Sequence, residues 1–502
     1  MNKKRLLAIG LILLLGILFR GWDFGNNPAG ITDDEASLGY NAYSLLRTGK
    51  DEYGKSMPTL IRSFGTYASS LYTYMTVVPV KLLGLNAVSV RAVSLISGII
   101  LIFLGIYLWG VIGGLVIAIS PVFVFYSRST FETNLALMIL FLGLALVKKK
   151  SVVMAFVLIS LSAYAYHVER VLSLILMFVL FWYFYKIPKF KKIAIVSLVL
   201  GLVIQIPLFW LSFSRGANSR ISALGHSGGY LYLYSTYFSP NNIFSRPDPA
   251  PNKSFPELGI FYWWMIVPFV LGIAKIIKNK EYKSLTGILF FTLMLTAPAV
   301  AAITHDYFST WRALPMFMIF AWFISRGLES QLNKKNIIYI FLILVAFLEM
   351  YSNLVLIKHE QSASWGYQYQ ALAEFVKNAP GESIVVDNTR SGSMYVWLAF
   401  YNQYDPQKFQ SRFNNLWLSN YYDHVDFNPN IKMDNIDIRP IDWKKDAYQQ
   451  EILVSDPLGI SDSQAKEHFL DKIGEIGDIN GQPVLKIYRT NPTAKISGKI
   501  SQ

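Results

Sequence analysis

The stretch ITDDEA, residues 31–36, places three consecutive acids directly after the first apolar run of the chain. Adjacent carboxylates repel one another, and each loses solvation near a low-dielectric boundary. A chain that keeps such acids there usually has a chemical use for them, so this stretch is a candidate catalytic centre. The alternative is that Asp33 and Asp34 cap a helix predicted over residues 36–46, where acids complement the helix dipole.

The composition around this stretch is that of a multi-span membrane protein. The chain has 502 residues, of which 53% are hydrophobic and 15% aromatic, and its apolar runs approach the roughly 20 residues that a membrane span requires. It has no cysteine, which excludes disulfides, cysteine nucleophiles and thiolate metal sites. The fold class is therefore mainly α, a polytopic bundle of membrane helices.

The first apolar run, residues 6–19, follows a basic start and resembles a secretory signal. Because Arg20 follows in place of a small-residue cleavage site, we expect this run to be kept as the first span. Further runs occur at residues 87–108, 111–125, 134–147, 152–166, 172–185, 193–212, 260–277, 285–303, 313–324 and 337–357. Together they predict about eleven transmembrane helices, several of them extended by flanking residues.

The lysine clusters predict the orientation. With a cytoplasmic N-terminus and alternating spans, the clusters at residues 148–150, 186–192, 275–283 and 326–335 all fall on the cytoplasmic side. The net charge of +14 thus marks orientation in the cell membrane and does not indicate nucleic-acid binding. An extra span at residues 67–83 would reverse the later clusters, so we expect an amphipathic or re-entrant helix on the outer face there.

This topology divides the chain into two domains. Residues 1–357 form a transmembrane domain with large outer loops at 20–86 and 213–258, and residues 358–502 form an extracytoplasmic domain. In that tail, strands are predicted at 383–387, 451–455 and 483–488, and helices at 365–377, 394–401 and 463–473. The alternation indicates a small α/β domain, which would bind an acceptor or cover the site.

Short motifs on the outer side then show a resemblance to a known family. They are DEA at 34–36, GYNAYSLL at 39–46, TGKDEYG at 48–54, SP at 120–121, YSR at 126–128, FETN at 131–134, YHVER at 166–170 and FSP at 238–240. In this order, the set resembles the membrane glycosyltransferases of the GT-C fold. It is most similar to the branch of the protein O-mannosyltransferases and lipid A aminoarabinose transferases.

The resemblance implies an activity and its partners. Such enzymes take a sugar from a polyprenyl phosphate, either undecaprenyl or dolichyl, and transfer it to an acceptor hydroxyl on the outer face of the membrane. The acceptor is a protein, a lipid or a polysaccharide, and membrane lipids surround the site. Two other functions stay open: a transporter of a lipid-linked or soluble solute, and a non-enzymatic scaffold or receptor.

The matched positions give candidate catalytic residues. Activation of an acceptor hydroxyl needs a carboxylate, and Asp34 is the candidate general base. Glu35 would orient Asp34 or bind a metal ion or a sugar hydroxyl. Glu132 occupies the place where the family carries a second-loop acid, and the alternative is that it is an acid at the start of a helix. A divalent ion, Mg, Mn or Zn, is possible with Glu35 and His167 as its candidate ligands.

Cations at outer span ends are candidates for the donor site, since a guanidinium fork matches phosphate oxygens. The positive-inside bias disfavours Arg128, Arg170 and Arg312 at such positions, which singles them out. The alternative for each is snorkelling to lipid phosphates or pairing with a nearby acid. His167 and His305 complete the predicted set for donor phosphate or sugar, although a lone histidine near an interface is more often structural.

Overall fold

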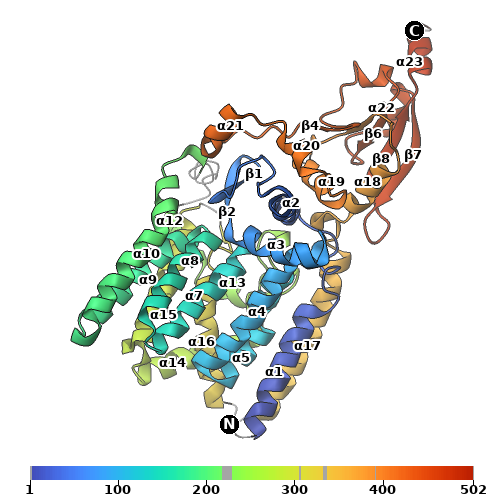
Figure 1. The fold of residues 1–502 in the computed structure, drawn as a ribbon. Helices are drawn as coiled ribbons and strands as arrows, with labels where there is room; N and C mark the ends of the chain where they lie inside the picture. The colour runs from blue at the N-terminus through green and yellow to red at the C-terminus, as the bar shows by residue number, and fades with distance from the viewer. Residues whose placement is uncertain (1–2, 217–228, 305–306, 332–335, 391, 501–502) are drawn as a thin grey trace.

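The computed structural model describes residues 3–216, 229–304, 307–331, 336–390 and 392–500. Long helices stand side by side in one bundle, and a β-sheet lies beyond one end of it (Figure 1). The N-terminus lies at the opposite end of the bundle from this sheet (Figure 1). Between the bundle and the sheet lie a short hairpin and α2 (Asp33–Thr48), whose first turn carries the acidic stretch.

Each apolar run predicted from the sequence forms one or more helices. The bundle helices are α1 (Lys3–Gly21), α4 (Ala87–Trp109), α5 (Val111–Ile119), α6 (Pro121–Arg128), α7 (Glu132–Lys148), α8 (Val152–Ala165), α9 (Val168–Tyr185), α10 (Lys191–Leu211), α14 (Ile266–Lys278), α15 (Leu285–Ala302), α16 (Leu314–Gln331) and α17 (Asn336–His359). Among the described residues, five helical segments are long and apolar enough to cross a membrane, or six if the bent pair α5 and α6 forms one span. The chain is thus a membrane protein, and the figure of about eleven spans stays a prediction.

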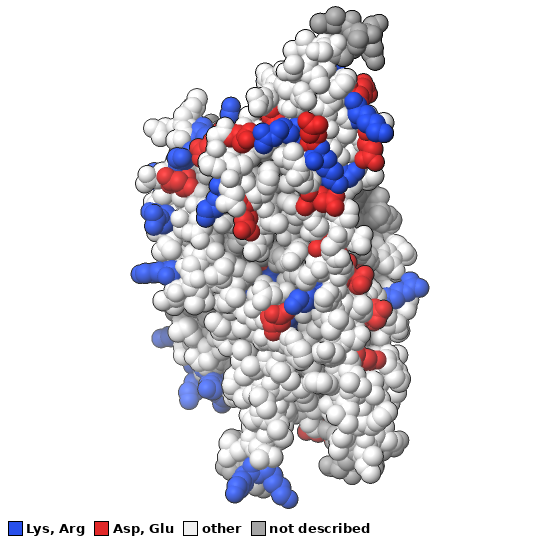
Figure 2. All heavy atoms as spheres, turned by 90° about the vertical axis from the view of Figure 1, so that its right-hand side faces the viewer, with Lys and Arg blue, Asp and Glu red and all other residues white. Residues whose placement is uncertain are grey.

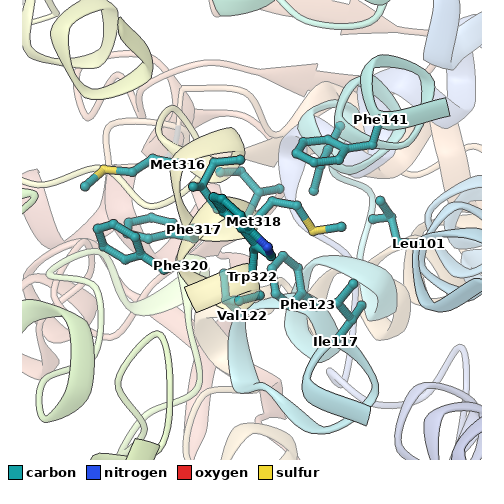
Figure 3. Close-up of a cluster of buried hydrophobic side chains, with 14 of the residues drawn as sticks. Leu101, Ile117, Val122, Phe123, Phe141, Met316, Phe317, Met318, Phe320 and Trp322 are labelled. Atoms are coloured by element: carbon teal, nitrogen blue, oxygen red, sulfur yellow. The ribbon is translucent and has the colours of Figure 1, made fainter. Parts of the chain in front are cut away.

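A hydrophobic core runs through the middle of the bundle. Figure 3 shows side chains from α4, α5, α6, α7 and α16 in contact, among them Leu101, Phe123, Phe141 and Trp322. All of them are buried. Because α16 is buried along almost its whole length, the other helices pack around it, and their outward faces are left to the lipid.

Charged side chains avoid the middle of the bundle. In the face shown in Figure 2, most Lys, Arg, Asp and Glu side chains lie over the upper part of the molecule, the lower part is mainly uncharged, and a basic group lies at its foot. This distribution is the one expected of a protein whose bundle lies in a bilayer and whose upper part is in water.

The polar segment after α1 builds the surface above the bundle. α2 begins with a capping box, in which Thr32 Oγ1 accepts from Glu35 N and the Glu35 carboxylate accepts from Thr32 N. The hairpin follows as β1 (Leu60–Ser63) and β2 (Thr66–Ser69). α3 (Leu71–Leu83) comes next and lies across the end of the bundle, at a steep angle to the long helices (Figure 1). A helix was expected here from residue 67, and its place on the outer membrane face stays a prediction.

The tail forms a six-stranded mixed sheet with the strand order β4-β5-β3-β6-β8-β7. Its strands are β3 (Ile384–Val386), β4 (Ile431–Met433), β5 (Ile436–Ile438), β6 (Ile452–Ser455), β7 (Leu470–Gly477) and β8 (Pro483–Thr490). β3 pairs in parallel with β5 and β6, and the outer strands are antiparallel. The helices α18 (Gln368–Lys377), α19 (Tyr395–Tyr401), α20 (Pro406–Gln410), α21 (Asn415–Ser419), α22 (Asp462–Glu467) and α23 (Pro492–Ile500) accompany it.

One predicted helix of the tail is wrong in its second half. The expected helix over residues 463–473 stops at Glu467, and β7 begins at Leu470. Phe469 between them has a positive φ of 51°, which ends the helix. β7 then pairs with β8 along its length, and this ladder outweighs the local helical pattern.

Candidate active site

A polar cavity lies between the start of α2, the hairpin and the ends of the bundle helices. Its volume is about 900 Å³ out to its open mouth. The polar and charged side chains that line it are Thr32, Asp34, Ser37, Asn41, Ser63, Thr73, Ser129, Thr130, Glu132, Thr133, Tyr166, His167, Asn252, Lys253 and Arg312. Four residues predicted from the sequence, Asp34, Glu132, His167 and Arg312, are therefore brought together in one cavity.

Asp34 lies in the first turn of α2 with its side chain exposed to this cavity. In the described ranges no hydrogen bond or ion pair engages its carboxylate. The helix cap is instead Thr32, so the capping role considered for Asp34 is filled by another side chain. A carboxylate that is accessible and unpaired can accept a proton from a bound hydroxyl group.

Asp33, the acid before it, points to the C-terminal domain. Its carboxylate accepts hydrogen bonds from Ser393 Oγ at 3.0 Å and from the backbone N–H of Asp34 at 2.9 Å. Burial and the neighbouring charge of Asp34 raise the pKa of Asp33. The two adjacent acids thus differ in their surroundings, and only Asp34 lines the cavity.

Glu35 is buried in an ion pair with Arg91 of α4, 2.9 Å from Nε to Oε1. Its carboxylate also accepts from Ser129 Oγ at 3.1 Å and from the backbone N–H groups of Thr130 and Thr32 at 2.9 and 3.1 Å. Burial alone would raise the pKa of Glu35, but the Arg91 guanidinium and the hydrogen bonds outweigh it and hold this pKa below its usual value. Glu35 therefore stays ionised in place.

These contacts bear on the possible metal ion. Both oxygens of Glu35 are already occupied by protein donors, and Glu35 does not line the cavity. Throughout the part of the chain that the structure describes, no three His, Asp or Glu side chains converge to hold a metal. The described residues therefore do not fit a divalent ion on Glu35 and His167. The position of Glu35 favours a role in holding the first turn of α2, and with it Asp34.

Glu132, His167 and Arg312 approach the cavity from three bundle segments. Glu132 is the first residue of α7, and His167 immediately precedes α9. The Arg312 guanidinium lies 5.1 Å from the Trp311 ring centroid and donates to Thr304 Oγ1 at 2.6 Å. A cation held over an aromatic ring in the lining of a cavity is suited to bind an anionic group.

Arg128 is placed differently from the expectation. It is buried and does not line the cavity. Its guanidinium donates to the backbone carbonyls of Phe19, Trp22 and Asn27 at 2.7, 2.7 and 2.8 Å. These bonds connect the end of α6 to the end of α1 and the loop after it, so the geometry favours a structural role for Arg128.

Arg170 and His305 complete the predicted set. Arg170 Nη2 donates to Ser69 Oγ of β2 at 3.2 Å, which places the arginine beside the hairpin but outside the cavity lining. His305 lies outside the described residues. The site residues thus fall into those that line the cavity and those, such as Arg128, that lie behind its wall.

Lys253 is a cavity cation that the sequence reasoning missed. It ends a short 3₁₀ helix, Pro251–Lys253, in the long outer loop. Its Nζ lies 5.1 Å from the ring centroids of both Phe131 and Trp311. It forms no ion pair among the described residues, and it acts electrostatically on Asp33 and Asp248. The signal in the sequence is a lysine in a loop that the predicted topology places on the outer side, where the positive-inside bias disfavours it as it disfavours the three arginines.

Two solved structures resemble the whole chain. ArnT from Cupriavidus metallidurans in the apo state superimposes with a TM-score of 0.58 at 12% identity, covering 97% of this chain and 98% of ArnT. The same protein bound to undecaprenyl phosphate gives a TM-score of 0.59 at 12% identity, covering 96% and 97%. The chain has the fold of ArnT. Because ArnT is a GT-C enzyme, the fold predicted from the motifs is confirmed. No known sequence family and no curated protein matches the chain in sequence.

Proposed function

We propose that the chain is an integral membrane glycosyltransferase that moves a sugar from a polyprenyl phosphate to an acceptor hydroxyl. The observation that carries this proposal is the unpaired Asp34 carboxylate in one cavity with the cations of Lys253 and Arg312. An acid to activate the acceptor and cations to hold a phosphate are the two requirements of this reaction. The ArnT fold, in one case bound to undecaprenyl phosphate, supports the same reaction class.

Asp34 would act as the general base. The acceptor O–H gives its proton to the Asp34 carboxylate, and the acceptor oxygen attacks the anomeric carbon of the donor sugar. The bond from this carbon to the phosphate oxygen breaks, and its electron pair remains on the phosphate. The products are the glycosylated acceptor and the free polyprenyl phosphate. Glu132, at the start of α7, lines the same cavity and is suited to hold sugar hydroxyls.

The leaving phosphate gains negative charge, so it needs cations already in place. Lys253 and Arg312 both lie against the Trp311 ring, at 5.1 Å from its centroid. A phosphate between them would be held on two sides while the acceptor approaches from Asp34. His167 provides a further nitrogen in the lining for a phosphate or sugar oxygen.

The polyprenyl tail would lie in an apolar groove of the bundle. This groove, about 1760 Å³ including its open side, is lined by residues of α14, α15 and α16. It extends from Phe238 and Pro240 in the outer loop to Tyr282 beside the other end of α14. Its walls are almost entirely hydrocarbon and aromatic, which suits an isoprenoid chain. The same outer loop supplies Lys253 to the polar cavity, so head group and tail would be held by one segment.

The sidedness follows from the lysine clusters. We propose that the foot of the bundle is cytoplasmic and that the cavity and C-terminal domain face outward from the cell membrane. The acceptor would then be a protein, lipid or polysaccharide of the outer face, and the tail domain would bind it or cover the cavity. Contacts of the tail with the first loop, such as Ser393 with Asp33, support a role beside the site.

The proposal is tested by product formation in liposomes. The purified chain is given an undecaprenyl-phosphate-linked sugar with a cell-envelope extract as acceptor, and release of undecaprenyl phosphate and glycosylated product is followed by mass spectrometry. We expect release that requires both the chain and the extract. Sugar movement across the vesicle wall without any glycosylated product would instead support a transporter. If the chain showed neither transfer nor transport, the proposal would be contradicted.

A further inference from the structure

A second cavity lies on the other face of strand β1. Ile61 and Ser63 line the polar cavity described above, and Arg62 between them lines the second one. Side chains alternate across a strand, so β1 forms a wall shared by the two cavities. The opposite wall of the second cavity is formed by the tail, from α20 and α21 to β4. Its volume is about 900 Å³ including its open side.

Three cations line this cavity without forming an ion pair in the described part of the chain, although the buried Glu52 carboxylate acts electrostatically on one of them, Arg62. Arg62 is only 6% exposed, and its guanidinium donates to the backbone carbonyls of His424, at 3.4 Å, and Asp426. Arg412 and Lys432 are exposed, and Arg412 donates to the Lys432 carbonyl. Within the described ranges none of the three cations forms an ion pair. A buried guanidinium without a carboxylate is costly unless an anion compensates it.

Neutral donors add to these cations. The Oδ1 atom of Asn430 accepts from Asn388 Nδ2 at 3.2 Å, and Oδ1 of Asn428 accepts from Asn430 N at 3.0 Å. Both amide oxygens are engaged inside the protein, so the NH₂ groups are left as donors. Asp426 is the one acid among the described lining residues. The polar part of the lining thus consists mainly of donors, which suits a ligand rich in acceptor oxygens.

Aromatic side chains form the remaining wall. The Arg62 guanidinium lies 4.8 Å from the ring centroid of Tyr53 and 5.5 Å from that of Trp417. The two rings are 5.5 Å apart and inclined by 23°. Ring edges and faces pack well against the C–H groups of a sugar, and a hydroxyl-rich ring satisfies donors around it.

We propose that this second cavity binds an acidic saccharide, a sugar that carries a carboxylate or a phosphate. Arg412 and Lys432 bind the anionic group at the mouth, Arg62 supplies the positive field at the base, and the asparagine amides bind hydroxyl oxygens. This inference rests on the proposed function, because it assigns the acceptor: an acidic glycan held beside β1 with its hydroxyl reaching the polar cavity on the other face.

The test measures saccharide binding to the full chain in detergent, without any donor. Tetragalacturonate supplies the carboxylate and glucose 1-phosphate supplies the phosphate, with maltotetraose as the neutral comparison. The variant Arg412→Gln with Lys432→Gln removes two exposed charges at the mouth. The matched control, Lys444→Gln with Lys466→Gln, removes two exposed lysine charges from residues that do not line the cavity. Binding of undecaprenyl phosphate is measured on all three proteins.

We expect at least one anionic saccharide to bind the parent and the control alike, and the cavity variant to lose at least about tenfold in affinity. Maltotetraose should bind more weakly than the anionic saccharide that binds. Binding of tetragalacturonate would indicate an acceptor with a carboxylate, and binding of glucose 1-phosphate would indicate an acceptor with a phosphate. The inference is overturned if neither anion binds the parent, or if cavity variant and control lose affinity equally. Undecaprenyl phosphate should bind the cavity variant as well as it binds the parent. If it bound none of the three proteins, the proposed function would fail, independently of the saccharide result.

Discussion

The Arg91 guanidinium donates to both carboxylate oxygens of Glu35, at 2.9 Å from Nε and 3.0 Å from Nη2. Arg91 also donates to the backbone carbonyls of Gly25, Pro28 and Gly30. One side chain of α4 therefore fixes both the loop after α1 and the first turn of α2. Asp34 is the residue before Glu35, so the proposed base is held by a neighbour that never enters the cavity.

Removal of one member of this buried pair should be strongly destabilising. Arg91→Ala leaves the Glu35 carboxylate buried without its cation, and we expect a loss of about 3–5 kcal/mol in unfolding free energy. Asp23→Ala is the control, because Asp23 and Lys358 form a half-exposed ion pair that is worth less than about 1 kcal/mol. Thermal unfolding in detergent compares the two variants. An equal loss in both would show that the Arg91 pair does not hold α2.

Asp34→Asn keeps the shape of the side chain and removes its basicity. We expect folding and donor binding to be nearly unchanged and transfer to fall by about 100-fold or more, the scale of a lost general base. Asp33→Asn should reduce transfer much less, because Asp33 faces Ser393 and lies outside the cavity lining. The two variants are compared in the liposome assay. Full activity in Asp34→Asn, with loss in Asp33→Asn or Glu132→Gln, would place the base elsewhere.

The sequence was sufficient to predict a mainly helical membrane bundle and to single out Asp34 as a candidate, because both depend on local patterns. Apolar runs predict the bundle helices, and an acid next to a span stands out wherever it occurs. The role of Glu35 could not be predicted in this way. Its partner Arg91 lies 56 residues away and inside an apolar run, so their contact exists only once α2 packs against α4.

Lys253 and the strands of the tail also could not be predicted from local sequence patterns. A lysine in a long loop has no periodic pattern around it, and only the folded loop brings it to Trp311. β4 and β5 have three residues each, too short for an alternating pattern to stand out. Their place in the sheet is fixed by pairing with each other and with β3, which the local sequence does not encode.

Lys253→Ala should weaken binding of undecaprenyl phosphate by about 1.5–3 kcal/mol, the scale of a hydrogen bond to a charged group. Arg312→Ala should act in the same direction, since both cations lie against Trp311. Lys444→Ala is the control, because this exposed lysine lines neither the polar cavity nor the apolar groove. Affinities are measured by ligand-dependent thermal shift. Unchanged affinity in both Lys253→Ala and Arg312→Ala would show that the donor phosphate does not bind beside Trp311.

Two further acids join the first loop to the tail. The Asp51 carboxylate accepts from the Tyr421 hydroxyl at 2.5 Å, and the Glu52 carboxylate accepts from Asn41 Nδ2 at 3.1 Å and from the Tyr395 hydroxyl at 3.4 Å. Both acids are fully buried. Burial raises the pKa of Asp51 to about 6 and that of Glu52 to about 8.

These shifts predict that the protein loses stability as the pH rises. In the unfolded chain both acids titrate near pH ~4, so between about pH 4 and 8 the folded state binds more protons than the unfolded state. The unfolding free energy must then fall with increasing pH, because ionisation leaves charge in a buried contact. Glu52→Gln mimics the protonated acid and should flatten the decline between pH 6 and 8, and Asp51→Asn should flatten it between pH 4 and 6. Glu374→Gln, an exposed change on α18, should keep the parent's slope. The test measures the melting temperature of each protein between about pH 4 and 8. If the melting temperature of Glu52→Gln fell with pH as steeply as that of the parent, Glu52 would already be ionised in the folded protein.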